Sequence, residues 1–186
     1  MKRCFDLFLV VFAISFFLLP IFLLAFFVKL TSSGPVIYWS NRVGLNNAIF
    51  RMPKFRTYIL GTPTVASNLL IESNKYLTPI GKFLRKNSLD ELPQLWSILV
   101  GDMSFVGPRP ALFNQNELIK LRTELNIHLL VPGLTGWAQV NGRDELTITE
   151  KVKLDLCYLQ KQSLWFDIRI IWKTFYKVVG RVGVSH

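Results

Sequence analysis

The sequence has few of the residues that build disulfide frameworks or zinc sites. Its 186 residues include two cysteines and two histidines. Cys4 adjoins an apolar segment and Cys157 falls within an expected helix, which argues against a disulfide framework and favours a reducing, cytosolic setting. With only His128 and His186, and without a Cys-x-x-Cys pair, the chain is not expected to hold a structural zinc ion.

Acidic residues are also scarce relative to basic ones. Twelve Asp and Glu stand against 22 Lys and Arg, for a net charge of +10. Such a balance predicts anionic partners, namely lipid headgroups, phosphates or nucleic acid. We do not expect nucleic acid, because the basic residues are spread along the chain and no nucleic-acid-binding motif is visible.

One long apolar segment, Leu7 to Val28, is present near the N-terminus. About 20 such residues are enough to cross a membrane, and the segment is too long for a cleaved signal peptide. Proline in a helix interior removes a hydrogen bond and favours a kink, here at Pro20. Lys2 and Arg3 precede the segment and Lys29 follows it, so basic charge does not select one side. A kinked transmembrane span and a re-entrant hairpin both fit these residues.

The remaining 158 or so residues are enough for one compact domain, and they contain no internal repeat. A short β-hairpin is predicted from Val36–Trp39 and Ile49–Met52, across a turn at 44–47. Helical patterns cover Pro79–Lys86, Leu92–Val100, Glu117–Leu125, Glu145–Gln162 and Leu164–Val179. The last helix has an apolar stripe through Ile168, Ile171 and Phe175. The pattern favours a core-facing helix, while the interspersed Trp, Lys and Arg leave an interfacial helix open.

The segment Ser88–Pro110, SLDELPQLWSILVGDMSFVGPRP, combines residues suited to phosphoryl chemistry. Asp90 and Glu91 are adjacent carboxylates, one able to act as a nucleophile and the other able to hold a metal ion. The plainer interpretation is a capping box, with Ser88 as N-cap and Glu91 at the third helical position. Pro93 and the nearby cationic residues weaken that interpretation, because the turn is stiff and the carboxylates have possible partners.

Three further segments supply candidate binding groups. Gly107-Pro108-Arg109-Pro110 restricts the backbone around a guanidinium, which suits phosphate binding, although a surface turn explains it equally well. Alternation in Lys54-Phe55-Arg56-Thr57 places Lys54 and Arg56 on one side of an extended segment, as a phosphate clamp or as a plain edge-strand charge pair. The loop Val131–Leu146 is rich in Gly and polar side chains that suit a nucleotide or sugar; on its own it is a long turn. Its candidate side chains are Gln139 and Arg143.

Taken in order, the segments KFRT, SLDELPQLWSILVGDMSFVGPRP, VPGLTGWAQVNGR and RVGVSH, behind an apolar hairpin, resemble bacterial sugar transferases. These are the monotopic phosphoglycosyl transferases that begin polyprenol-linked glycan assembly. The resemblance covers nearly the whole chain and implies the minimal catalytic form. It departs from the family pattern where Tyr58 follows KFRT, and where Ser40, Arg42, Gly44 and Asn47 replace the more common Gln-x-Arg-x-Gly-x-x-Gly.

The resemblance implies a fold, a reaction and a set of residues. The fold is α+β and helix-rich, with residues 1–30 as a re-entrant membrane helix broken at Pro20. Residues 31–186 form one small cytosolic catalytic domain with interfacial amphipathic helices and a short β-hairpin. The reaction transfers a phospho-sugar from a UDP-sugar to polyprenol (undecaprenyl) phosphate, releases UMP, and takes place at the cytosolic face of the bacterial inner membrane.

The resemblance also assigns roles within the site. Asp90 is the nucleophile that forms an aspartyl phospho-sugar, and Glu91 with Asp90 holds Mg²⁺. Arg85 and Arg109 match phosphate-binding positions, with Gly107 and Pro108 shaping the turn. We expect the cationic surroundings to keep both carboxylates ionised. Two other functions fit the residues: hydrolysis of the same donor, and a non-catalytic basic protein anchored to a membrane. The sequence does not identify the sugar, the glycan pathway or the oligomeric state.

Overall fold

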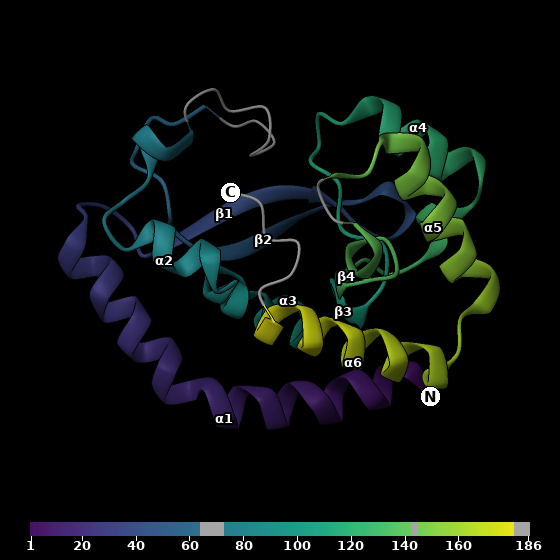
Figure 1. Ribbon diagram of the computed structural model, residues 1–186, viewed down its shortest axis with the longest axis horizontal. Helices are drawn as coiled ribbons and strands as arrows, with labels where there is room; N and C mark the ends of the chain where they lie inside the picture. The colour runs from purple at the N-terminus through teal and green to yellow at the C-terminus, as the bar shows by residue number, and fades with distance from the viewer. Residues whose placement is uncertain (64–72, 143–144, 181–186) are drawn as a thin grey trace.

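A computed structural model describes residues 1–63, 73–142 and 145–180 of the chain. It is a helix-rich α+β structure in which a long N-terminal helix runs along the base of a domain built from short helices and two small sheets (Figure 1). The predicted fold class is confirmed at this level.

Helix α1, Lys2–Thr31, contains the apolar segment and continues through Pro20 rather than ending there. The helix that was predicted to break at Pro20 is therefore continuous. Its axis changes direction between its two ends (Figure 1). Val10 and Val28 are fully buried against the domain, one in each half of the helix. The outward side chains are exposed and apolar: Phe8, Phe12, Phe16, Leu19, Phe22, Phe26 and Leu30. By length and composition α1 could cross a membrane.

The predicted hairpin is present and is longer than expected. Strand β1, Ile37–Val43, pairs antiparallel with β2, Ile49–Phe55, and Trp39 lies opposite Pro53. Asn46 and Asn47 adopt left-handed backbone conformations in the connecting turn, which Asn tolerates better than most residues. Asn47 can therefore stand where the related pattern has glycine.

The segment that carries the two carboxylates is not an ordinary helix start. Helix α2, Gly81–Lys86, leads to a 3₁₀ helix, Leu89–Gln94, which runs directly into α3, Leu95–Val100. Within the described part of the chain, Ser88 makes no side-chain cap bond, and its backbone is left-handed (φ 54°). The capping-box interpretation is wrong, because the Glu91 carboxylate bonds to cationic side chains from other elements instead.

A second, parallel sheet was not foreseen from the sequence. Strands β3, Ser104–Val106, and β4, Gly133–Thr135, are three residues each, too short to show an alternating pattern. A Cβ on Gly133 would lie 2.1 Å from the backbone nitrogen of Gly107, so only glycine allows this approach. Gly133 and Gly136 of the Val131–Leu146 loop thus allow close packing against the Gly-Pro-Arg-Pro turn.

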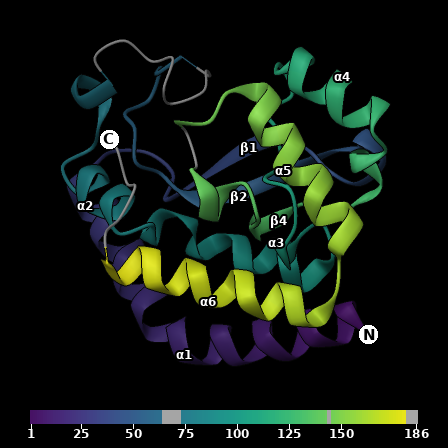
Figure 2. The same ribbon diagram turned by 45° about the vertical axis from the view of Figure 1, so that its right-hand side comes forward.

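Helices α4, Asn116–Glu124, and α5, Ile148–Lys161, confirm two sequence predictions, and α5 begins with a capping box between Thr147 and Glu150. Helix α6, Leu164–Gly180, is also confirmed and runs beside the first part of α1 (Figure 2). The prediction of a core-facing apolar stripe is wrong for Ile168 and Phe175, which are exposed, whereas Ile171 is half-buried against the core. The fully buried residues of this helix are Asp167 and Ile170. The exposed large side chains of α6 are mostly aromatic: Trp165, Ile168, Trp172, Phe175 and Tyr176.

Candidate active site

The two carboxylates meet a lysine from the hairpin. Lys54 lies on β2, which packs against the 3₁₀ helix that carries Asp90 and Glu91. Its ammonium donates to Glu91 Oε1 at 2.7 Å and lies 3.8 Å from Asp90 Oδ2. Asp90 is buried, with 8% of its surface exposed. One lysine therefore bridges both members of the dyad.

The Gly-Pro-Arg-Pro turn adds a guanidinium to the same carboxylate. Arg109 Nη2 donates to Glu91 Oε1 at 2.7 Å, while about two-fifths of the Arg109 side chain is exposed. Gly107, Pro108 and Pro110 are buried, so the turn is part of the core and not a solvated surface turn. Arg109 is thus held at the dyad with one side still open to a ligand.

Arg85, near the end of α2, is a third cationic residue that acts on the dyad. Its charge acts on the Asp90 carboxyl, and its Nη1 donates to the Tyr58 hydroxyl at 2.7 Å. Tyr58, the residue that departs from the family pattern after KFRT, therefore orients a guanidinium of this site. The side chain that differs is in contact with the site and not remote from it.

The two adjacent carboxylates differ in their electrostatics. Burial raises the pKa of Asp90, and the negative charge of Glu91 adds to this rise, while Lys54, Arg85 and Arg109 oppose it. Burial also acts to raise the pKa of Glu91, but Arg109 and Lys54 outweigh it and hold that pKa well below its ordinary value. Glu91 is therefore a firmly ionised anchor. The expectation that the cationic surroundings keep both carboxylates ionised is supported for Glu91 and stays a prediction for Asp90, whose pKa is raised by burial.

The structure separates the two residues of the expected clamp. Arg56 is 4% exposed, and its guanidinium donates to the carbonyls of Ser32 and Ser33, just after α1. These bonds hold the Arg56 side chain at the end of α1. Lys54 therefore lies at the dyad, and Arg56 does not. The prediction that Lys54 and Arg56 share one side assumed a continuous extended segment. Strand β2 ends at Phe55, before Arg56, so the alternation does not continue to that residue.

The loop residues have different outcomes. Gln139, in the 3₁₀ helix Gln139–Asn141, is 8% exposed, and its carboxamide makes no hydrogen bond within the described residues. A Cβ on Gly136 would lie 2.1 Å from the Gly107 carbonyl oxygen and 2.7 Å from Gln139 Oε1, which places the carboxamide beside the turn. Arg143 lies outside the described residues, so its predicted role stays a prediction.

Arg42 is a cationic residue that the candidate set omitted. It lies on β1 and donates from Nη1 to the Pro110 carbonyl at 3.2 Å. Burial and the charge of Arg109 lower its pKa to about 10, while the charge of Glu91 acts in the opposite direction. Alternation along the strand was the sequence signal for Arg42, because it places Ser40 and Arg42 on the same face of β1. These two residues lie opposite Met52 and Phe50, on the face of β2 that carries Lys54.

The site's donors fit a magnesium ion only in combination with a phosphate ligand. Within the described residues, no cluster of three or more His, Cys, Asp or Glu side chains is found. Mg²⁺ commonly binds one or two carboxylates and completes its shell with waters and substrate phosphates. Asp90 and Glu91 match that donor set, although Glu91 Oε1 already accepts from Lys54 and Arg109.

The site as a whole carries excess positive charge. Four cationic groups, Lys54, Arg85, Arg109 and Arg42, act on two carboxylates. This excess suits a ligand with several negative charges, such as a diphosphate. A buried, weakly paired carboxylate at its centre is the kind of group that can attack a phosphorus once the phosphate charge is offset.

The chain is similar to one known family and to several known proteins. The family described as "Bacterial sugar transferase" matches residues 1–181. The chain is 40% identical over 161 residues to the UDP-glucose:undecaprenyl-phosphate glucose-1-phosphate transferase of Escherichia coli, covering 83% of this chain and 35% of that protein. It is 34% identical over 201 residues to the undecaprenyl-phosphate galactose phosphotransferase of Salmonella typhimurium, covering 98% of this chain and 41% of that protein.

A third relative is similar in length. The uncharacterized sugar transferase EpsL of Bacillus subtilis is 37% identical over 187 residues, covering 100% of this chain and 90% of EpsL. The chain therefore spans about a third of the E. coli protein and about two-fifths of the Salmonella protein, and it spans most of EpsL.

Proposed function

Because the chain belongs to the bacterial sugar transferase family, we propose that it transfers a phospho-sugar from a UDP-sugar to polyprenol phosphate and releases UMP. The E. coli relative is named as a glucose-1-phosphate transferase acting on UDP-glucose and undecaprenyl phosphate, and the Salmonella relative as an undecaprenyl-phosphate galactose phosphotransferase. The observation that carries the proposal here is Asp90, a buried carboxylate 3.8 Å from Lys54 and beside the ion-paired Glu91.

In the first step Asp90 attacks the β-phosphorus of the UDP-sugar. A bond forms between an Asp90 carboxylate oxygen and phosphorus, and the bond from that phosphorus to the bridging oxygen breaks. UMP leaves with the bridging oxygen and its electron pair, and an aspartyl phospho-sugar remains. No base is required, because the nucleophile is a carboxylate that acts in its ionised form.

In the second step polyprenol phosphate attacks the same phosphorus. A phosphate oxygen of the lipid bonds to phosphorus, the Asp90–phosphorus bond breaks, and the carboxylate is restored. Two steps allow one small site to serve a soluble donor and then a lipid acceptor in turn. The exposed apolar sides of α1 and α6 support a position of this site next to the membrane that holds the acceptor.

The cationic residues have separate roles in this scheme. Lys54 lies close enough to orient Asp90 and to offset charge on the reacting phosphoryl group. Arg109 and Arg85 bind phosphate oxygens, and Glu91 keeps Lys54 and Arg109 in place. Asp90 and Glu91 would hold Mg²⁺ together with the diphosphate, and the ion would supply further charge neutralisation.

We propose that α1 enters and leaves the membrane through the same face. At its start Lys2 bonds to Asp167 and Tyr158, Arg3 donates to two α3 carbonyls, and Asp6 accepts from the Phe105 amide. At its other end Arg56 holds the carbonyls of Ser32 and Ser33. A straight 30-residue helix would be about 45 Å long and would carry its ends apart, whereas both ends here are bonded to one domain.

Nucleotide release tests the reaction. The purified protein with Mg²⁺, a short-chain polyprenol phosphate and a panel of UDP-sugars should release UMP in a lipid-dependent way from its true donor. Asp90→Ala should abolish release, whereas Asp102→Ala, which removes an exposed carboxylate, should leave it intact. Release of UDP would instead indicate direct glycosyl transfer and contradict the proposal. UMP with free sugar phosphate and no lipid product would indicate hydrolysis.

A further inference from the structure

Four consecutive backbone carbonyls at the turn around Arg109, those of residues 108–111, accept hydrogen bonds from other segments. Proline has no N–H, so a turn with two prolines is held largely through its carbonyl oxygens. The four consecutive acceptors and their donors are Pro108 with the Gly133 amide at 2.9 Å, Arg109 with Arg122 Nη1 at 2.8 Å, Pro110 with Arg42 Nη1 at 3.2 Å, and Ala111 with the Val43 amide at 2.9 Å.

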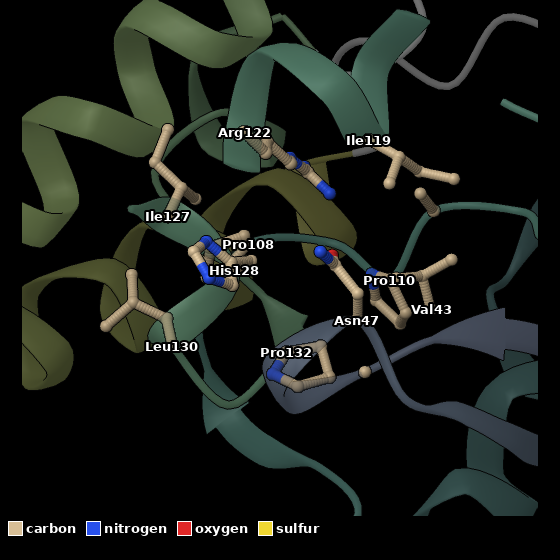
Figure 3. Close-up of a pocket in the computed structure, with 12 residues that line it drawn as sticks. Val43, Asn47, Pro108, Pro110, Ile119, Arg122, Ile127, His128, Leu130 and Pro132 are labelled. Atoms are coloured by element: carbon tan, nitrogen blue, oxygen red, sulfur yellow. The ribbon is translucent and has the colours of Figure 1, made fainter. Parts of the chain in front are cut away.

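Arg122 is the donor that acts on Arg109 itself. It reaches from α4 toward the turn, between the flanking residues Pro108 and Pro110 (Figure 3). Its Nε and Nη2 donate to Asp155 Oδ2 on α5, at 3.0 and 2.6 Å. The side chains are 11% and 1% exposed, so this ion pair is buried. Arg122 therefore binds a carboxylate on one side and the Arg109 carbonyl on the other.

We propose that Arg122, held by Asp155, is a positioning residue for Arg109 in the phosphoryl transfer described above. This inference rests on the proposed function. Arg109 donates to Glu91 Oε1 from a side chain that is about two-fifths exposed, and the position of its guanidinium depends in part on the backbone from which it projects. Arg122 holds that backbone at the same residue. Arg122 does not touch the dyad, because its guanidinium is directed to Asp155 and the Arg109 carbonyl.

A purely structural role would be the alternative, since the pair also joins α4 to α5. Removing either partner alone would leave an uncompensated buried charge and would destabilise the fold. Replacing both by apolar residues of similar size is often tolerated. The informative variant is therefore Arg122→Met with Asp155→Leu, which keeps α4 and α5 packed but removes the bond to the Arg109 carbonyl.

The test is a double-mutant cycle that combines this paired variant with Arg109→Ala. Lipid-dependent UMP release is measured for the four proteins, with Lys120→Met as the control because Lys120 is an exposed residue on the same helix. We expect the paired variant to lower kcat/KM by roughly 10- to 100-fold, a typical cost of misplacing a binding group. In the Arg109→Ala background the same pair should change kcat/KM less than about twofold, because the group it positions is gone.

Two results would overturn the inference. One is a paired variant with wild-type kcat/KM, and the other is an equal loss in both backgrounds, which would indicate a general structural effect. If the paired variant does not fold, Arg122→Lys serves in its place, because one ammonium cannot reproduce the fork to both acceptors.

Should the wild-type protein release no UMP, the proposed function fails. Hydrogen exchange over residues 104–113 then tests whether Arg122 holds the turn that carries Arg109. Faster exchange in the paired variant than in Lys120→Met then supports Arg122 as the support of the turn, and unchanged exchange overturns it.

Discussion

Adjacent carboxylates at this site have unequal surroundings. Glu91 accepts from Lys54 and Arg109 through one oxygen, whereas Asp90 lies 3.8 Å from Lys54 and is buried. The first arrangement favours a fixed negative charge, and the second leaves a carboxylate less stabilised by its partners and therefore more reactive. In the proposed mechanism, these unequal contacts suit Glu91 to the role of anchor and Asp90 to the role of nucleophile.

The raised pKa of Asp90 predicts how activity depends on pH. Only the ionised carboxylate attacks, so activity should fall as pH decreases through the Asp90 pKa, which lies above its ordinary value of 3.8. Lys54 is the strongest of the charges that lower this pKa, so Lys54→Met should move the acid limb of kcat/KM to higher pH. Arg51→Met is the matched control, because Arg51 is a neighbouring cation whose side chain packs on Trp39 on the other face of β2. An acid limb that does not move in Lys54→Met would contradict this assignment.

At the residue scale, local sequence was enough for some members of the site and not for others. Asp90, Glu91 and Arg109 lie in short, stiff segments whose residue types already indicate phosphoryl chemistry. Arg42 and Arg122 were not selected, because their significance comes from carbonyls 68 and 13 residues away in the chain. Arg56 was misassigned for the same reason, since its partners lie 23 and 24 residues earlier.

At the scale of the elements, the junction after α1 contains a glycine whose backbone conformation and surroundings both disfavour a side chain. Gly34 has φ +111°, and a Cβ there would lie within 3.3 Å of both Arg56 Nη1 and Arg56 Cζ. A side chain at residue 34 would therefore displace the guanidinium that holds the Ser32 and Ser33 carbonyls. This contact joins the end of α1 to β2, the strand that carries Lys54.

Substitution of this glycine should loosen α1 from the domain. We expect Gly34→Ala to lower the free energy of unfolding by roughly 1–3 kcal/mol or more, from backbone strain and displacement of Arg56. Thermal unfolding in lipid nanodiscs measures the loss. Gly61→Ala is the matched control, because Gly61 also has positive φ (+87°) but nothing described lies within 4 Å of its Cβ position. Equal losses in the two variants would show that the Arg56 contact contributes nothing.

The elements also show where sequence patterns give the wrong orientation. Ser88 to Glu91 has the spacing of a capping box, yet Glu91 forms charge-assisted bonds to Lys54 and Arg109, which are stronger than a neutral cap bond. In α6 the apolar stripe was assigned to the core, but Asp167 takes a core position because Lys2 and Tyr158 satisfy its carboxylate. Both errors come from partners that are distant in sequence.

At the scale of the whole molecule, the attachment of both ends of α1 determines the expected topology. Val10 packs with Met52, Leu95 and Ile98, and Val28 packs with Phe55 and Leu84, so both halves of α1 lie against the domain. A membrane-spanning α1 would have to break one set of these contacts. We therefore expect the N-terminus and the catalytic domain on the same, cytosolic side.

Thiol labelling tests this topology. In a variant with Cys4 and Cys157 replaced by Ser, one reporter cysteine is placed in a short tag before Met1 and, separately, at the exposed Lys153 of α5. A membrane-impermeant maleimide should label both reporters in inside-out vesicles and neither in sealed right-side-out vesicles. Labelling of the two reporters from opposite sides would contradict a re-entrant α1.

The covalent role of Asp90 is decided by the mass of the protein after donor is added without acceptor. Intact-protein mass spectrometry of a rapidly quenched mixture with Mg²⁺ and the active UDP-sugar should show one added sugar phosphate, located by fragmentation on Asp90. The addition should be absent in Asp90→Asn, present in Asp102→Asn, and lost from the wild-type protein when polyprenol phosphate is added. A wild-type enzyme that turns over but never carries this mass, or carries it on another residue, would contradict the two-step mechanism.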